Sequence, residues 1–342
     1  MGGKALNKYG VFTERKNTEE FLRIGEELKD RILWDFDGPN QDIFAEIVTC
    51  YRTKPDHGDL DLLVHVPEGV QIDWRMYIMN TFKPNAINVN SGVYSFDFEG
   101  FQIDIIPIPA TQWDTAIVYF SYDPLGNIMG KTYHKFNLSY GWEGLFYKYR
   151  NSHGTNSANI LLSTDVRRIY DFGGYDYDRY LKGFDTLEEI FRFCIDSKYF
   201  DVEMFQMENL NSIDKKRNRK RGSYHLFLNY LKDNGIDTKF EFNKNKEYYL
   251  LDIDNAFPEV KLMNKLHDLQ MKDEMQQAIA EKFNGELVME WIPGLEGKEL
   301  GAAIGKFKQH LDDNFNLFIL NSEIDEIRHR FMIVYNNEWG SK

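Results

Sequence analysis

Short apolar runs separated by turn residues dominate the first third of the chain and predict strands. Each run has the length and the β-branched and aromatic content that favour extended backbone. The dipeptide Glu99-Gly100 between the last two runs predicts a tight hairpin. The predicted strands are Asp42–Cys50, Asp59–Val66, Ile87–Asn90, Tyr94–Phe98 and Phe101–Pro107. In the first of them, Phe44 and Ile47 would also suit a helix.

Two segments among these strands have helical periodicity. Residues 13–31 predict a helix, with Asn17 or Thr18 as its cap and acidic residues in its first turn. Residues 74–82 predict a second helix, which stops at Pro84. The order of elements up to about residue 115 is therefore α-β-β-α-β-β-β, which is typical of a compact mixed α/β domain.

From about residue 136 the pattern becomes mainly helical. Leu210–Leu231 predicts a long helix or a helix pair, whereas Tyr248–Ile253 predicts a strand. The other predicted helices are Trp142–Arg150, Leu187–Ile195, Leu262–Phe283, Gly297–Phe315 and Glu323–Tyr335. The predicted fold class is α+β, with a mixed-sheet domain at 1–135 and mainly helical domains at 136–240 and 241–342.

The composition is that of an ordinary soluble protein. The 342 residues are 42% hydrophobic and 28% charged, enough for a substantial core, and no apolar run is long enough to span a bilayer. The N-terminal residues lack the apolar core of a secretory signal. Two cysteines, Cys50 and Cys194, have no metal-site spacing, and we expect reduced thiols in a cytoplasmic protein. The net charge of −13 argues against a surface that binds nucleic acid on all sides.

Three aspartates in apolar strands are the main chemical signal. Asp59 and Asp61 are two residues apart and point to the same face of their strand, and Asp104 lies in a later strand. An ionised carboxylate among Leu and Ile is costly unless it is paired. Converging carboxylates suit a hard divalent cation, Mg²⁺ or Mn²⁺. The alternative is that these are exposed acids on a half-buried sheet.

The segments around these aspartates resemble the DNA polymerase β-like nucleotidyltransferases. That superfamily includes family X DNA polymerases, poly(A) polymerases and CCA-adding tRNA nucleotidyltransferases. Its signature is a Gly-Ser turn, then an hDhDh strand (h is apolar), then a third acid. Here the strand is Gly58–Val64 and the third acid lies in Gln102–Ile106. The resemblance implies a nucleotidyltransferase palm domain in which Asp59, Asp61 and Asp104 hold metal and catalyse nucleotidyl transfer.

The same resemblance implies residues for the nucleoside triphosphate. In Val48–Lys54, Thr49 falls on the Ser of the signature and Arg52 on its second basic residue. Thr49, Arg52, Lys54 and Gly58 are therefore expected to bind the nucleotide. Val48 departs from the pattern, because the family has a glycine there that lets the backbone approach the triphosphate.

A basic cluster stands out in this acidic chain. Six of the seven residues in 215–221 are Lys or Arg, which suits sequence-independent contact with phosphates. The alternative is a solvated helix face. The expected nucleic-acid contacts are Lys215, Lys216, Arg217, Arg219, Lys220 and Arg221.

Two glycine-rich segments receive different interpretations. Pro293–Gly301 is similar to a Gly-rich turn near the end of CCA-adding enzymes, although a turn that packs a helix pair is the simpler explanation. Gly126–Thr132 has three residues between its glycines where a P-loop needs four, and we predict a turn.

Together these features predict an Mg²⁺-dependent nucleotidyltransferase that adds NMP from an NTP to a nucleic-acid 3′ end and releases pyrophosphate. RNA, including a tRNA 3′ end, is preferred as acceptor because of the C-terminal resemblance. Three alternatives stay open: a family X-like DNA polymerase, transfer to a protein or small molecule, and an inactive nucleic-acid-binding module.

Overall fold

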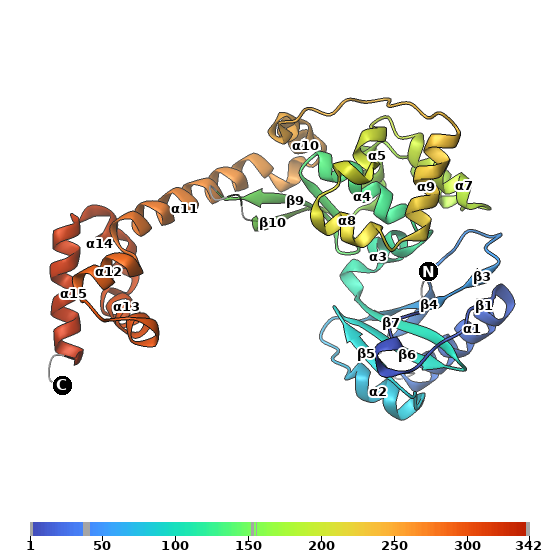
Figure 1. Ribbon diagram of the computed structural model, residues 1–342, viewed down its shortest axis with the longest axis horizontal. Coiled ribbons are helices and arrows are strands. Elements are labelled where there is room, and N and C mark those ends of the chain that lie inside the picture. Colours follow the sequence, from blue (N-terminus) through green and yellow to red (C-terminus); the bar gives the residue numbers. More distant parts are fainter. Residues whose placement is uncertain (1–2, 37–41, 152–153, 155, 340–342) are drawn as a thin grey trace. The chain divides into compact units, whose positions relative to one another are not determined.

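The computed structural model describes residues 3–36, 42–151, 154 and 156–339. It forms two compact units: the chain up to Lys148 together with Ala158–Val260, and Tyr149–Ser157 together with the chain from Lys261 onward. The fold is mixed α/β, with a mixed sheet and many helices (Figure 1). The predicted boundary at residue 135 falls within the first unit, and the division into three domains stays a prediction.

A five-stranded mixed sheet forms the N-terminal part of the first unit. Strands β4 and β7 run parallel, and the other neighbours are antiparallel. All five strands coincide with predicted strands within a few residues. In spatial order they are β2 (Phe44–Ile47), β4 (Asp59–Val66), β7 (Phe101–Pro109), β6 (Val93–Phe98) and β5 (Ile87–Asn90).

One face of this sheet packs on helices α1 (Thr18–Asp35) and α2 (Trp74–Thr81). Gly25 allows the close approach, because a Cβ there would lie 2.3 Å from the Ile47 side chain. Helix α1 begins later than predicted, since β1 (Lys16–Asn17) pairs with β3 (Asp56–His57). The Asn17 side chain caps the helix by accepting from the Glu20 N–H, as predicted.

The opposite face of the sheet is apolar at one end only. There Leu63, Ile106 and Ile108 are buried against α3 (Trp113–Phe120). Period two along a strand puts Asp59 and Asp61 on the same face as Leu63, and Asp104 on the same face as Ile106. The polar end of this face is therefore where the candidate chemistry lies.

The rest of the first unit is built around aromatic side chains. Tyr133, Tyr170 and Phe184 are fully buried and pack with neighbouring rings. The helices are α4 (Leu125–Lys135), α5 (Val166–Gly173), α6 (Tyr177–Leu181), α7 (Leu187–Ile195), α8 (Ser212–Asn218), α9 (Gly222–Asp233) and α10 (Leu250–Ala256). A second sheet has the order β10 (Asn156–Ser163), β9 (Gly144–Arg150), β8 (Leu138–Gly141). The 3-10 turns are η1 (Asn7–Tyr9), η2 (Ala110–Gln112), η3 (Val202–Phe205), η4 (Met207–Asn209), η5 (Lys246–Tyr249) and η6 (Pro258–Val260).

Three sequence predictions in this part were wrong. Trp142–Arg150 is strand β9 rather than a helix, because Leu145, Tyr147 and Tyr149 are buried with period two. Tyr248–Ile253 ends η5 and opens helix α10 rather than forming a strand. Gly126–Thr132 is part of helix α4 rather than a turn.

The predicted helices elsewhere are confirmed, except that the helix predicted over Gly297–Phe315 already ends at Leu311. In the first unit, Leu187–Ile195 is α7, and Leu210–Leu231 contains the helix pair α8 and α9.

The second unit is mainly helical from Lys261 onward. Its core contains the mutually packed rings of Phe283, Phe307 and Phe331. The helices are α11 (Leu262–Lys282), α12 (Gly285–Trp291), α13 (Gly297–Leu311), α14 (Phe315–Asn321) and α15 (Ile324–Trp339), with η7 (Asp312–Asn314). Among the residues that the structure describes, none of the helices is both long and apolar enough to cross a membrane.

Candidate active site

The three predicted aspartates lie on adjacent strands of one sheet. Asp59 and Asp61 come from β4, and Asp61 stands in register with Asp104 on the parallel strand β7. Register partners in a sheet point to the same side. The fold therefore brings Asp104 to the same face as Asp59 and Asp61, which precede it by more than forty residues in the chain.

This face carries a surplus of negative charge. Burial raises the pKa of all three aspartates, that of Asp104 to about 6 and that of Asp61 well above its usual range. Repulsion from the neighbouring carboxylates adds to the rise at Asp61 and Asp104, while the positive charge of Lys54 opposes it at Asp59 and Asp61. Carboxylates that repel one another in a half-buried site are stabilised by a bound cation.

The side chains of the three aspartates are not arranged as a complete set of metal ligands. In the described part of the chain, no group of three or more His, Cys, Asp or Glu side chains forms a ready set of metal ligands. One oxygen of Asp59 accepts the Gly3 N–H at 3.2 Å, and one oxygen of Asp104 accepts the Gln102 amide at 2.9 Å. The type and charge of the donors fit a divalent cation, while the present side-chain positions leave the ligand set open.

The raised pKa of Asp104 predicts a pH-dependent gain in stability for Asp104→Asn in metal-free protein. The unfolded carboxyl has a pKa of about 3.9, so the folded wild type binds more protons between pH 4 and 6. Its unfolding free energy therefore falls as pH rises through this window. The variant lacks this penalty and should be more stable above pH 6, by at most about 3 kcal/mol at about 1.4 kcal/mol per tenfold change in acidity.

Urea unfolding in EDTA from pH 4.5 to 8 measures this difference. It should grow up to about pH 6 and then stay level. If the difference in unfolding free energy between variant and wild type were the same at every pH, the charge of Asp104 would not destabilise the folded protein.

The predicted nucleotide-binding residues fall in the loop after β2 and at the start of β4. Thr49 is exposed, and its carbonyl accepts the Tyr122 N–H at 2.8 Å. Gly58 is buried beside Asp59, and the charge of Lys54 reaches Asp59 and Asp61. Lys54 and Gly58 therefore border the carboxylates, and Thr49 follows Val48, whose N–H donates to the Asp61 carbonyl. Their role in binding nucleotide stays a prediction.

Arg52 has a different partner in the structure. Its guanidinium donates to the Asp185 carboxylate and to the Lys182 carbonyl, each at 2.5 Å. The backbone N–H of Arg52 also donates to the Phe184 carbonyl. A contact between Arg52 and a triphosphate would therefore require this exposed ion pair to open, which costs little.

Two residues that the sequence prediction missed also belong to this site. Asp123 adds negative charge near Asp59 and Asp61, and Ser223 donates to its carboxylate at 3.1 Å. Gln102 is 2% exposed and stands in register with Asp59. Gln102 could have been found from the sequence, since it is two residues before Asp104 and shares its strand face. Asp123 has no such signal, because it lies in an irregular turn between α3 and α4.

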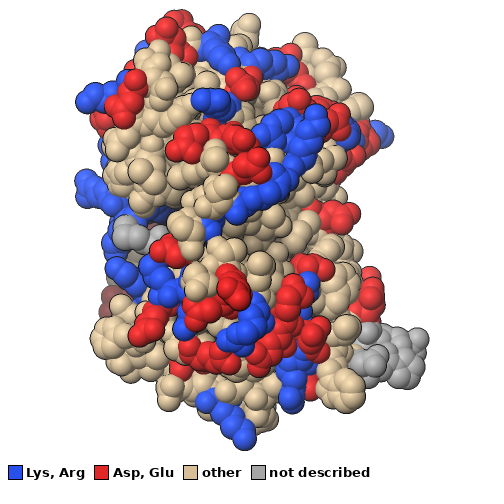
Figure 2. All heavy atoms as spheres, turned by 90° about the vertical axis from the view of Figure 1, so that its right-hand side faces the viewer, with Lys and Arg blue, Asp and Glu red and all other residues tan. Residues whose placement is uncertain are grey.

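The basic cluster lies on α8 and the turn into α9. Lys216, Arg217, Arg219 and Lys220 are exposed, and none has a carboxylate within 4.0 Å among the described residues. Lys215 and Arg221 are half-buried, and Lys215 donates to the Glu208 carbonyl. The face drawn in Figure 2 carries Lys and Arg intermixed with Asp and Glu, in keeping with an acidic chain that has local basic regions.

Helix α8 is held on α4 by buried polar contacts. Lys131 of α4 is 5% exposed, and its Nζ lies 2.6 Å from the Asp214 carboxylate. Burial lowers the pKa of Lys131, whereas at Asp214 the bond and charge of Lys131 outweigh burial and lower the pKa. Asn127 also donates to Asn218 at 3.3 Å. Of the four exposed cations, Lys216 and Arg217 are therefore carried on a fixed helix, and Arg219 and Lys220 lie in the turn that follows it.

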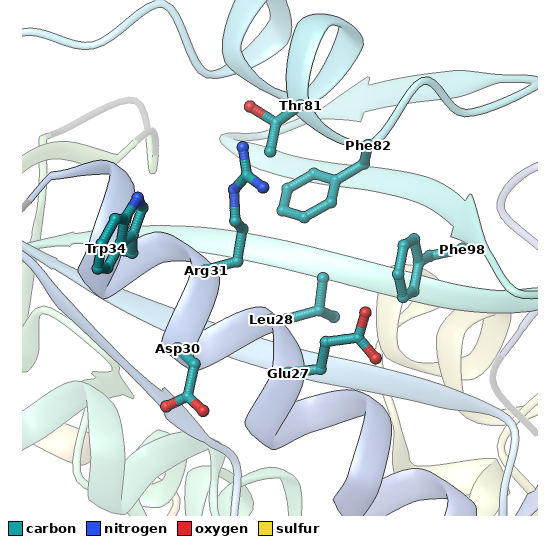
Figure 3. A pocket seen from close by; sticks show the side chains of 8 residues that line it. All are labelled: Glu27, Leu28, Asp30, Arg31, Trp34, Thr81, Phe82 and Phe98. Atoms are coloured by element: carbon teal, nitrogen blue, oxygen red, sulfur yellow. The ribbon is translucent and has the colours of Figure 1, made fainter.

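A pocket of about 570 Å³ lies on the other face of the sheet. Figure 3 shows Arg31 of α1 extending toward Thr81, with Trp34 and Phe82 on either side. Since Leu28 and Phe98 in its wall belong to the core between sheet and helices, the pocket does not open onto the aspartates. It takes no part in the candidate site.

Comparisons with known proteins add two structures of low similarity. No protein-family model matches the chain, and no curated protein matches it either. Polymerase beta from Leishmania infantum in a ternary gap complex aligns at 15% identity and a TM-score of 0.33, over 40% of this chain and 52% of that one. The same protein in a ternary P/T complex aligns at 14% identity and a TM-score of 0.35, over 48% of this chain and 74% of that one.

The chain thus spans about half the length of the first of these structures. At these TM-scores the likeness assigns neither fold nor activity to this chain.

Proposed function

We propose that this protein is a divalent-metal-dependent nucleotidyltransferase that transfers NMP from an NTP to a nucleic-acid 3′ end. The observation that carries the proposal is the placement of Asp59, Asp61 and Asp104 on one face of β4 and β7, with Asp61 and Asp104 in register. Few structural roles require three half-buried carboxylates with raised pKa values at the polar end of one sheet face.

Asp59, Asp61 and Asp104 would hold the metal. Bound Mg²⁺ or Mn²⁺ would supply Lewis-acid stabilisation of phosphoryl charge and lower the pKa of the attacking hydroxyl. Oxygen-only ligands favour these ions over zinc. Lys54 and the exposed Thr49 border the same face, where they would contact the triphosphate.

In the proposed reaction the 3′-hydroxyl oxygen forms a bond to the α-phosphorus, and the bond from that phosphorus to the pyrophosphate oxygen breaks. The hydroxyl proton passes to Asp104. A carboxylate is ionised at neutral pH and can accept the proton of a hydroxyl whose pKa a bound cation has lowered. The pyrophosphate leaves with the electron pair of the broken bond, so charge and atoms balance.

The basic cluster supports a nucleic-acid acceptor. The exposed cations Lys216, Arg217, Arg219 and Lys220 lie on helix α8, which is fixed to α4, and in the turn directly after it. Such cations neutralise phosphates without selecting a sequence. The proposed preference for RNA rests on the similarity of Pro293–Gly301 to the Gly-rich turn of CCA-adding enzymes.

The test is incubation with each labelled NTP, Mg²⁺, and RNA and DNA primers with and without a template. Incorporation into RNA without a template is the expected result. Template-dependent extension of DNA would indicate the family X-like alternative, and label on polypeptide or a small molecule would indicate another acceptor. Metal-independent RNA binding without incorporation would indicate an inactive module and contradict the proposal.

Neutralising exposed cations of the basic cluster should weaken nucleic-acid binding and its salt dependence. For the double variant Lys216→Gln with Arg217→Gln, each lost phosphate contact should reduce the slope of log K against log salt by about 0.7 on single strands. Filter binding or anisotropy between 50 and 300 mM salt, as rough limits, covers the range in which this slope is usually measured. Lys232→Gln, on the exposed end of α9, is the control. An unchanged slope would exclude these two side chains from the interface.

A further inference from the structure

The segment Gly3–Leu6 lies against the carboxylates rather than free in solvent. The Gly3 N–H donates to Oδ2 of Asp59 at 3.2 Å, and the Ala5 N–H donates to Oε1 of Gln102 at 2.8 Å. Gln102 in turn donates through its Nε2 to Oδ1 of Asp104 at 2.9 Å. One short stretch of backbone is thus connected to two of the three aspartates, directly and through one amide.

The segment is anchored on both sides of these contacts. Leu6 is 1% exposed, and the Thr13 hydroxyl donates to the Gly3 carbonyl at 2.9 Å. Gly3 has a φ of +80° and lies so close to β4 that a Cβ would come within 2.2 Å of the Gly58 carbonyl oxygen. Only glycine combines this backbone conformation with this approach.

The contacts determine how the carboxylates are oriented. A ligating carboxylate commonly uses one oxygen for the ion while the other accepts a hydrogen bond from an outer partner. Asp59 and Asp104 each have one oxygen engaged in this way. Because the Ala5 N–H binds Oε1 of Gln102, it also fixes which end of that amide faces Asp104, namely the NH₂ group.

We propose that Gly3, Ala5 and Gln102 are positioning residues of the active site, which orient Asp59 and Asp104 for a divalent cation. This inference rests on the proposed function, since it concerns the same carboxylates. It differs from the signature of the superfamily, which contains neither the N-terminal segment nor Gln102. The segment stabilises the site by donating hydrogen bonds and does not itself contact the ion.

The test uses Gly3→Ala with Gly10→Ala as a matched control. Gly10 has nearly the same φ, +78°, and follows the segment by four residues, but its Cβ would meet nothing within 4 Å. The two substitutions impose similar backbone strain, and only the first displaces the segment from Gly58. Gln102→Met is a second variant, which removes the amide that links Ala5 to Asp104. The dissociation constant for Mn²⁺ alone is measured by electron paramagnetic resonance, and melting in EDTA reports folding.

We expect Gly3→Ala and Gln102→Met to weaken Mn²⁺ binding by about 10–100-fold, the usual effect of removing an outer partner of a metal ligand. Gly10→Ala should bind Mn²⁺ like the wild type. Unchanged binding by both Gly3→Ala and Gln102→Met, or tighter binding by either, would overturn the inference while leaving the proposed function intact. Wild type that binds no Mn²⁺ would instead overturn the proposed function and this inference with it.

Discussion

The double variant Asp59→Asn with Asp61→Asn should lose nucleotidyl transfer by about a thousandfold or more, equivalent to about 4 kcal/mol of transition-state stabilisation. Both substitutions keep the size and burial of the side chains on β4 but remove two of the three negative charges that would hold the cation. The rate should be measured with saturating Mg²⁺ and the best NTP and primer, together with the Mn²⁺ dissociation constant.

The matched control for this variant is Glu46→Gln on β2 of the same sheet. Glu46 is exposed, and its carboxylate is engaged by Lys29 of α1 at 3.1 Å rather than by any residue of the candidate site. Its activity should equal that of the wild type. Transfer by the double variant at more than a tenth of the wild-type rate would show that these carboxylates do not hold a catalytic ion.

Lys131→Met should lower the free energy of unfolding by about 3–5 kcal/mol, because removing one partner of a buried ion pair leaves the other charge uncompensated. The Asp214 carboxylate is 14% exposed and has Lys131 as its ion-pair partner at 2.6 Å. Since Asp214 lies in α8, the loss should also loosen the helix that carries the basic cluster, and nucleic-acid affinity should fall with it. Urea unfolding measures the stability.

Two further variants show whether the effect belongs to the pair. Combining Lys131→Met with Asp214→Leu removes both charges and should cost less than Lys131→Met alone. Lys135→Met, one turn along α4, breaks a longer and more exposed contact with Asp201 at 3.6 Å and should cost about 1 kcal/mol or less. Equal losses of unfolding free energy for Lys131→Met and Lys135→Met would show that burial does not increase the contribution of the Lys131–Asp214 pair to stability.

Several errors of the sequence prediction have one physical cause, namely that short apolar runs are ambiguous between helix and strand. The aromatic residues of Trp142–Arg150 are compatible with both the helical and the strand period. Pairing with β8 makes this segment a strand. Tyr248–Ile253 is apolar enough for a strand, but Ile253 and Tyr249 are buried as a helical turn. In Asp59–Val66 the strand pattern extends over eight residues, and the predicted bounds match those of strand β4.

The sequence by itself determined that the three aspartates lie in apolar strands and that Asp59 and Asp61 share one strand face, because a period of two and an apolar setting are local properties of β4 and β7. It also determined the basic cluster, which is contiguous in the chain. Only the tertiary structure decided that Asp61 and Asp104 stand in register, that Arg52 pairs with Asp185, and that Gly3 contacts Asp59. Those contacts join residues 43 to 133 positions apart, and no local pattern encodes a partner at that distance.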